Sequence, residues 1–403
     1  MLGKKKKFRC NLFAFLYHSH KTYFAALDLT AGVSWTSHRW TDQRRESQKK
    51  KSVIQNNKKM NRKLFAACLV LLCTALVACD RNEGDDPENP ITPPSTPTHV
   101  YVAGSTAHMF DMGPAVCWVD GAMQTLDASA YSPALTVCVM GNDVYYGGCN
   151  SANRPVIWKN GTEQLMSNDN GCVTDIKTAN NKLYACGYVN ARPVYWVDGQ
   201  MTQLPIDPDN EYGSYKTTAI FISGNDIYVA GTVFNNMSYG DGAYLWKNGV
   251  MQKLSNKNAA ANDVCVISGT VYVVGSEVYN DGGFHKSVMW TNGTIRDIQV
   301  NTGFDSRAIA VAPMNGKPYV VLEGWLGDAW TGGFQGFAWY NEATTKLNNC
   351  QRPQDVFIHG SDIYIAGVST SFSHSPILLK NNAKVNLSVP SPGYGGCHGV
   401  FVK

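Results

Sequence analysis

One short pattern occurs seven times between residues 99 and 403. Each copy is a run of alternating apolar residues that contains a tyrosine and ends at or near a glycine, as in HVYVAG and DIYIAG. The tyrosines are spaced 39 to 47 residues apart: Tyr101, Tyr145, Tyr184, Tyr228, Tyr272, Tyr319 and Tyr364. Alternation with a period of two predicts β-strands, and this spacing predicts a repeat protein built from small sheets.

A second pattern follows each of these strands. YLWKNGVMQKL, residues 244–254, has a tryptophan, then Asn-Gly, then another alternating run, and the other six units carry related segments. Asn-Gly and Asp-Gly supply the two positive-φ residues of a type I′ turn, which predicts a tight antiparallel hairpin. One strand position of the hairpin is aromatic in six units and Leu379 in the last: Trp118, Trp158, Trp196, Trp246, Trp290 and Trp339. We expect these side chains to be core.

A third alternating run precedes every tyrosine strand except the first, so a complete unit holds four strands, a to d. Such a unit cannot bury its aromatic row alone, and packing face to face around an axis solves this. The body begins at strand b and ends with HGVFVK, residues 398–403, which has the alternation of strand a. The sequence therefore predicts an all-β fold, a seven-bladed β-propeller of four-stranded antiparallel blades over 99–403, closed by the C-terminal strand joining the first blade.

A segment typical of a secretory signal precedes the repeats. From Met60 the chain reads MNRKLFAACLVLLCTALVACD, two positive charges followed by about fifteen apolar residues, which is short for a membrane span. Its end, Leu76-Val77-Ala78-Cys79, resembles the lipobox of bacterial lipoproteins. The resemblance implies that residues 60–78 are a signal peptide cut before Cys79, which becomes lipidated. Residues 1–59 are expected to be a mis-annotated or non-structured extension.

Residues 79–98 are acidic and then proline-rich, so we expect an extended tether. With the repeats, the chain resembles bacterial β-propeller lipoproteins with Y-V-A-G…W-K-N-G units, and it lacks the Gly-His and Trp-Asp pairs of WD40 units. The resemblance implies a place in the cell envelope, at the outer membrane or cell surface by a lipid anchor. Acidic residues after Cys79 favour the surface, whereas Asp80 leaves retention at the inner membrane open.

Charge and cysteine spacing exclude some partners. Residues 1–59 hold 14 Lys and Arg against 3 acids, but residues 80–403 hold 19 against 28. An acidic body argues against nucleic acid, because phosphate binding needs clustered basic side chains. The eight cysteines after Cys79 show no C-x-x-C or zinc-ligand spacing, so no metal or cofactor is expected. Disulfides are permitted outside the cytoplasm, with the pairing undetermined.

Candidate binding residues lie in the loops that join strand d to a and strand b to c, which share one face around the axis. We call this end of the propeller the loop face. Exposed aromatic rings there suit sugar rings or a protein partner, although packing under their own loops is an equal alternative. The candidates on this face are Tyr212, Tyr215, Trp325, Trp330, Tyr394 and His398.

Three carboxylates recur at one repeat position, just before strand a: Asp175, Asp263 and Asp355. Thr136, Ala219, Ala308 and Gly399 are expected at that position in the other units. Three carboxylates at the channel mouth could bind a cation or act in acid–base catalysis. The favoured role is structural, with each carboxylate accepting hydrogen bonds from nearby backbone amides.

The common catalytic motifs are absent from the body of the sequence. We therefore expect a monomeric, membrane-anchored, extracytoplasmic propeller that acts as a binding module or scaffold for a glycan or protein partner. The alternative is a polysaccharide hydrolase or lyase that uses the carboxylates at the channel mouth. A purely structural subunit of an envelope assembly is a third possibility.

Overall fold

The computed structural model describes residues 98–106, 113–129, 131–234, 241–279, 283–300, 302, 305–327, 332–369, 375–389 and 394–403. All of them belong to one compact unit, Pro94–Lys403. The predicted signal peptide, Cys79 and Trp330 lie outside these residues.

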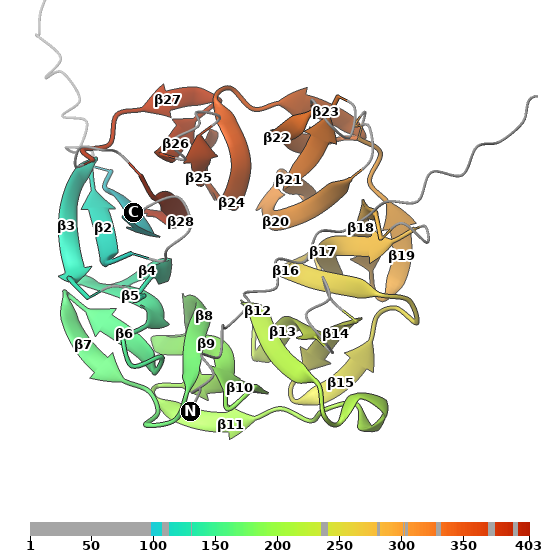
Figure 1. The fold of residues 1–403 in the computed structure, drawn as a ribbon, viewed down its shortest axis with the longest axis horizontal. Coiled ribbons are helices and arrows are strands. Elements are labelled where there is room, and N and C mark those ends of the chain that lie inside the picture. The colour runs from blue at the N-terminus through green and yellow to red at the C-terminus, as the bar shows by residue number, and fades with distance from the viewer. Residues whose placement is uncertain are drawn as a thin grey trace, which may run out of the picture. The chain divides into compact units, whose positions relative to one another are not determined.

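The described residues form seven four-stranded antiparallel sheets and one short 3-10 helix, η1 (Pro208–Asn210). The sheets are arranged as blades around an axis, and Figure 1 looks along that axis. The innermost strands are β4 (Ala134–Met140), β8 (Gly171–Ala179), β12 (Ser214–Ser223), β16 (Ala259–Ile267), β20 (Ser306–Met314), β24 (Cys350–His359) and β28 (Gly396–Val402). The second strands are β1 (Val100–Ser105), β5 (Asp143–Cys149), β9 (Lys182–Val189), β13 (Asp226–Phe234), β17 (Thr270–Val278), β21 (Lys317–Leu326) and β25 (Asp362–Ser369).

The third strands are β2 (Ala115–Val119), β6 (Pro155–Lys159), β10 (Arg192–Val197), β14 (Gly242–Lys247), β18 (His285–Thr291), β22 (Gly333–Tyr340) and β26 (Pro376–Lys380). The outer strands are β3 (Ala122–Asp127), β7 (Thr162–Leu165), β11 (Gln200–Gln203), β15 (Val250–Lys253), β19 (Thr294–Asp297), β23 (Ala343–Lys346) and β27 (Ala383–Val385). We number the blades 1 to 7 in chain order. Blade 1 contains β28 and β1–β3, blade 2 begins at β4, and blade 7 begins at β24.

Blade 1 is assembled from both ends of the propeller. Its sheet order is β28-β1-β2-β3, and β28 pairs antiparallel with β1, with Tyr101 opposite Phe401 and Val102 opposite Val400. The backbones of His99 and Lys403 extend the pairing with two further hydrogen bonds, of 2.7 and 3.0 Å. The predicted seven-bladed propeller, closed by the C-terminal strand, is confirmed.

The predicted hairpin turns are present, and their first residue has a second role. In blade 4, Asn248 and Gly249 have φ angles of 51° and 81°. The Asn248 side-chain oxygen also accepts the N–H of Ile227, at the start of β13, over 2.9 Å. In five other blades the side-chain oxygen of the equivalent residue accepts a backbone N–H of strand b, also over 2.9 Å. These residues are Asp120, Asn160, Asp198, Asn292 and Asn381. Asn and Asp therefore set the turn and also fix the hairpin to the neighbouring strand.

The core consists of seven apolar clusters, one at each interface between blades. In six clusters the tryptophan of one blade packs against side chains of the preceding blade, as Trp196 does with Ile157, and in the seventh cluster Leu379 takes the place of the tryptophan. The six tryptophans keep at most 3% of their surface exposed, and Leu379 keeps none. The prediction that these residues are core is confirmed.

The glycine of strand b lies against the same tryptophan. A Cβ atom added to Gly187 would lie 3.1 Å from Trp196 and would also collide with the carbonyl of Cys172 on the inner strand. At Gly231 the distance to Trp246 would be 2.9 Å. The glycine and the tryptophan of each repeat therefore contact each other directly: the indole ring packs against the glycine backbone, where a side chain would not fit.

Candidate functional site

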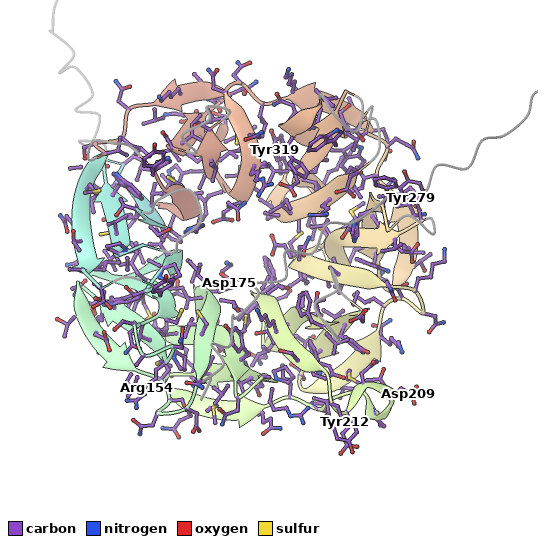
Figure 2. All side chains as sticks on the ribbon, viewed as in Figure 1. Arg154, Asp175, Asp209, Tyr212, Tyr279 and Tyr319 are labelled. Atoms are coloured by element: carbon purple, nitrogen blue, oxygen red, sulfur yellow. The ribbon has the colours of Figure 1, made fainter. Side chains whose placement is uncertain are left out.

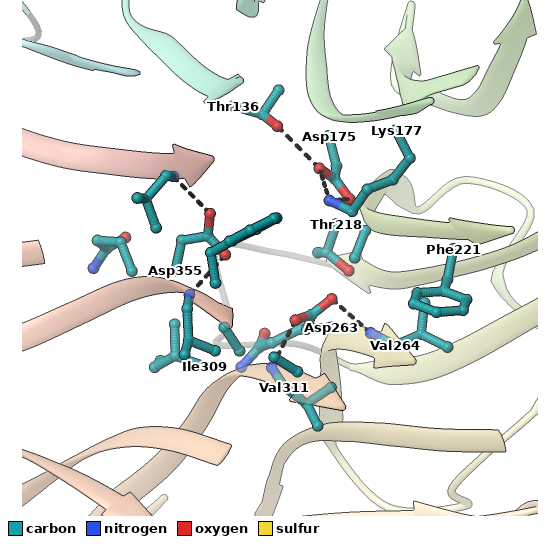
Figure 3. A pocket seen from close by; sticks show the side chains of 18 of the residues that line it. Thr136, Asp175, Lys177, Thr218, Phe221, Asp263, Val264, Ile309, Val311 and Asp355 are labelled. Carbon is teal, nitrogen blue, oxygen red and sulfur yellow. Dashed lines mark hydrogen bonds and ion pairs between the residues drawn. The ribbon is translucent and has the colours of Figure 1, made fainter. Parts of the chain in front are cut away.

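A β-bulge marks every inner strand at the same level of the channel. In blade 3 the register between β8 and β9 shifts between Val173 and Asp175, so Thr174 is the extra residue. The other inner strands have equivalent register shifts, and at each of them one extra residue faces the axis. These bulge residues all line a cavity of about 370 Å³, seen from close by in Figure 3: Leu135, Thr174, Thr218, Asn262, Ile309, Gln354 and His398.

The three predicted carboxylates directly follow a bulge residue, and all three line this cavity. Thr136, Ala219 and Gly399 occupy the equivalent positions of their blades, as expected. Ala308 does not, and this expectation is wrong. Ala308 pairs with Leu322 before the bulge, and the residue after the bulge in blade 6 is Ala310. The bulge thus falls two residues later than the comparison of the repeats predicts.

Each carboxylate joins its own blade to the next one. The two Asp263 oxygens accept the backbone N–H groups of Val264 and of Val311 on β20, each over 2.7 Å. Asp355 does the same with Val356 (2.8 Å) and with Val400 on β28 (2.9 Å). The second of these bonds secures the closing strand.

Asp175 follows the same rule between blades 3 and 4. One carboxylate oxygen accepts the N–H of Ile176 over 2.8 Å, and the other accepts that of Ile220 on β12 over 3.0 Å. The hydroxyl of Thr136, from blade 2, donates to the first oxygen over 3.0 Å. Backbone hydrogen bonding, the favoured role for the three carboxylates, is therefore what the structure shows.

Lys177 places a positive charge among these carboxylates. Its Nζ lies 2.7 and 2.9 Å from the two oxygens of Asp175, and 45% of its side chain remains exposed within the channel. Desolvation lowers the pKa of Lys177, but the charges of Asp175, Asp355 and Asp263 outweigh it and raise the pKa above its ordinary value. The lysine thus supplies the cation that such a group of carboxylates needs.

Burial changes the protonation of the other two carboxylates. Desolvation raises the pKa of Asp263 to about 7, and it raises the pKa of Asp355 to about 6, in both cases against the opposing charge of Lys177. Both groups therefore exchange protons near neutral pH. Within the described residues, no group of three His, Cys, Asp or Glu side chains is placed to hold a metal ion.

His398 is the bulge residue of β28 and lies in the wall of the same cavity. Its Nε2 is 3.1 Å from the hydroxyl oxygen of Ser105 on the paired strand. Burial lowers the pKa of His398 to about 4, so the ring is neutral at physiological pH. The structure thus brings His398 together with Asp175, Asp263 and Asp355.

The aromatic candidates do not gather at the channel. Tyr212 is 96% exposed and lies at the outer rim, on the far side of its blade from Asp175 (Figure 2). Trp325, on β21, packs edge-on against Phe334 at 5.1 Å between ring centroids and is half-buried. Tyr394 is half-buried just before β28.

Tyr215 is a correction, because its side chain is fully buried. It belongs to the start of β12 and not to the loop before it, so its ring points into the interface between blades 3 and 4. Its hydroxyl accepts the N–H of Asp207 over 3.0 Å, and the ring lies 5.8 Å from that of Tyr244. Tyr215 therefore stabilises the core and cannot face a ligand.

The exposed aromatic side chains of the described residues share one face. They are Tyr131 (55% exposed), Tyr212 (96%), Tyr279 (47%) and Phe284 (36%), and each lies in a loop from strand d to a or from b to c. The exposed large side chains on the outer strands are aliphatic instead: Leu165, Met201, Val250 and Ile295. The loop face thus differs in chemistry from the rest of the described surface.

No helix in the described part of the chain is long and apolar enough to span a membrane. No protein-family model and no curated protein matches the sequence.

The chain is similar to several solved structures at low sequence identity. One is a protein from Lactobacillus plantarum, 9% identical, covering 76% of this chain and 99% of that one, with a TM-score of 0.44. Another is the periplasmic gluconolactonase PpgL of Pseudomonas aeruginosa, which is 10% identical, covers 76% of this chain and 99% of its own, and has a TM-score of 0.44. A third is the β-propeller domain of the Trilobed protease of Pyrococcus furiosus, which is 11% identical, covers 73% of this chain and 93% of its own, and has a TM-score of 0.42. The strand pairing of this chain itself establishes that it is a seven-bladed β-propeller.

Proposed function

We propose that this protein is a lipid-anchored, extracytoplasmic binding module that holds a glycan or a protein partner on its loop face. The observation that carries the proposal is that the exposed aromatic rings of the described residues all lie on that face. Tyrosine and phenylalanine offer large, flat contact areas with few rotatable bonds. They therefore suit stacking on sugar rings and anchoring in a partner's pocket.

The channel supports this division of roles. Its polar side chains are largely engaged in holding the blades together, since Thr218 donates to the carbonyl of Ala261 over 2.9 Å and Asn262 donates to that of Ala308 over 2.7 Å. Both of these bonds cross from one blade to the next. A ligand that entered the channel would have to compete with such bonds, whereas the aromatic rings of the loop face are exposed to solvent.

A polysaccharide hydrolase or lyase is the second candidate, and one observation favours it. Asp263, with a pKa raised to about 7 by burial, could exchange a proton near neutral pH. Both of its oxygens accept backbone N–H groups, however, which ties the carboxylate to the fold. Loss of glycan turnover in Asp263→Asn, with folding intact, would favour the enzyme; binding without turnover favours the module.

The binding test compares the two kinds of exposed apolar side chain. A glycan array and chemical cross-linking in cells would identify the ligand of the intact chain. Tyr131→Ala and Tyr212→Ala should then weaken binding by about tenfold or more, since exposed aromatic anchors carry much of a contact's energy. Met201→Ser and Val250→Ser, on the outer strands, are the matched controls and should bind normally. Equal effects of both sets would refute a role for the loop face.

The anchor is proposed from the signal-like segment 60–78 and the lipobox that ends at Cys79. Cys79→Ala should abolish incorporation of labelled fatty acid and leave the signal uncut, because the lipid is attached to that thiol. Protease treatment of whole cells would digest the protein at the cell surface and spare it at the inner membrane. Labelling that persisted in Cys79→Ala would contradict the anchor.

A further inference from the structure

Two cysteines from neighbouring blades lie side by side. Cys149 is the last residue of β5 in blade 2, and Cys172 is the second residue of β8 in blade 3. Their side chains interact with each other, the Cys172 thiol donates to the backbone carbonyl of Val173 over 3.6 Å, and β5 packs against β8. The two residues keep 9% and 3% of their surface exposed.

The other cysteines that the structure describes have different surroundings. Cys117 bonds to Tyr146, Cys186 to the hydroxyls of Thr174 and Thr217, and Cys350 and Cys397 to backbone groups. Cys138 and Cys265 lie inside apolar strands. Cys350 also acts electrostatically on Cys397 between blades 7 and 1, but within the described residues the direct side-chain interaction of two thiols lies between blades 2 and 3.

That interface also lacks the aspartate bridge that three other interfaces have. Between blades 3 and 4, 5 and 6, and 7 and 1, an aspartate from one inner strand accepts a backbone N–H of the next. Blade 2 has Thr136 at this position, and its hydroxyl accepts the N–H of Ile176 over a longer 3.3 Å. A neutral acceptor at this distance makes a weaker bond than a carboxylate does.

We propose that Cys149 and Cys172 form a disulfide that cross-links blades 2 and 3. The proposal concerns a covalent modification and not the ligand, and its occurrence in the cell rests on the extracytoplasmic placement proposed above, where disulfides persist. The bond would close a loop that contains β6 and β7 and would restrict the unfolded chain accordingly.

The oxidant is a thiol–disulfide exchange partner, such as glutathione disulfide or an exported dithiol oxidase. Cys149 is the more exposed of the two residues, and its interaction with Cys172 lowers the pKa of Cys149 while it raises that of Cys172. The Cys149 thiolate attacks one sulfur of the oxidant, forms a mixed disulfide and releases one thiolate. The Cys172 thiolate then attacks the Cys149 sulfur, which forms the protein disulfide and releases the second. Two protons leave the protein thiols, and two electrons reduce the oxidant's disulfide to two thiols.

Peptide mapping tests the bond directly. The purified full chain is incubated with glutathione disulfide, alkylated and digested without reduction. We expect one linked species that joins the peptides of Cys149 and Cys172, with a mass lower by two hydrogen atoms than the sum of the reduced peptides. Absence of this species, or capture of either cysteine by another partner, overturns the proposal.

Thermal unfolding provides the second measurement. Adding a reductant to the oxidised chain should lower its Tm by about 5 °C, given the size of the loop and of the domain. Cys149→Ala/Cys172→Ala should show no such reductant-dependent shift, whatever its own Tm, whereas Cys265→Ala should keep it. A bond that forms in the test tube while the cysteines stay reduced in cells would contradict the extracytoplasmic placement and not the thiol geometry.

Discussion

Removal of the closing strand tests the architecture most severely. Deleting Cys397–Lys403 removes nearly all of β28, including Cys397, Val400 and Val402, which keep at most 3% of their surface exposed. Burying a side chain of this size contributes about 1.5–3 kcal/mol, so the three together account for about 4.5–9 kcal/mol. The deletion also leaves Asp355 without the N–H of Val400. A folded domain is stable by only about 5–15 kcal/mol, so the loss is a large share of the total.

The assay is urea unfolding followed by tryptophan fluorescence and far-UV circular dichroism. Trp118 packs in the same cluster as Val400 and Val402, so its emission should shift to the red in the truncated chain even before urea is added. The unfolding midpoint should fall sharply, and a synthetic peptide of residues 395–403 should restore part of it. A truncated chain that unfolded at the same midpoint as the intact one would refute the reasoning.

Two further predictions concern the channel and the strand glycines. The pKa values of Asp263 and Asp355 are raised to about 7 and about 6 in the folded chain, so the stability that they contribute is present below pH 4 and is lost as the pH rises toward 7. Asp263→Asn should therefore flatten the fall of Tm between pH 5 and 8, whereas Asp226→Asn, at an exposed turn where a lysine lowers the pKa, should leave that slope unchanged. Gly187→Ala should destabilise the chain by about 2 kcal/mol or more in chemical denaturation, because the added methyl group meets backbone and indole atoms. Gly333→Ala, where nothing lies within 4 Å, should change stability by less than about 0.5 kcal/mol, and equal effects at the two sites would contradict the packing argument.

Features that depend on residues close together in the sequence could be predicted. The turns, the number of blades and the buried tryptophans follow from local patterns that recur every 39 to 47 residues. The absence of an inner strand before the first unit indicated that the C-terminal strand completes it. The contacts between blades could not be predicted in detail. The bond from Val311 to Asp263 depends on how the inner strands of two neighbouring blades are placed beside each other, and no local pattern encodes that placement.

Two misjudged residues show the same limit. Tyr215 follows a loop rich in polar residues, and the sequence places it on the loop face. In the structure β12 already begins at Ser214, so Tyr215 lies within the strand and its ring points into the core. Ala308 was expected beside the carboxylates, but the bulge in β20 lies two residues further along. For Tyr215 the error lies in where the strand starts, and for Ala308 it lies in where the bulge falls, and sequence periodicity alone fixes neither strand ends nor bulges that closely.

The pairing of β1 with β28 also determines when this protein can finish folding. During synthesis β1 leaves the ribosome before every other strand of the ring, and its partner leaves after all of them. Until then the backbone edge of β1 has no neighbour, so six blades can assemble while the first stays open to mispairing. Closure of the ring is therefore a late event, and a pause in synthesis before Gly396 would keep the inner edge of β1 unpaired.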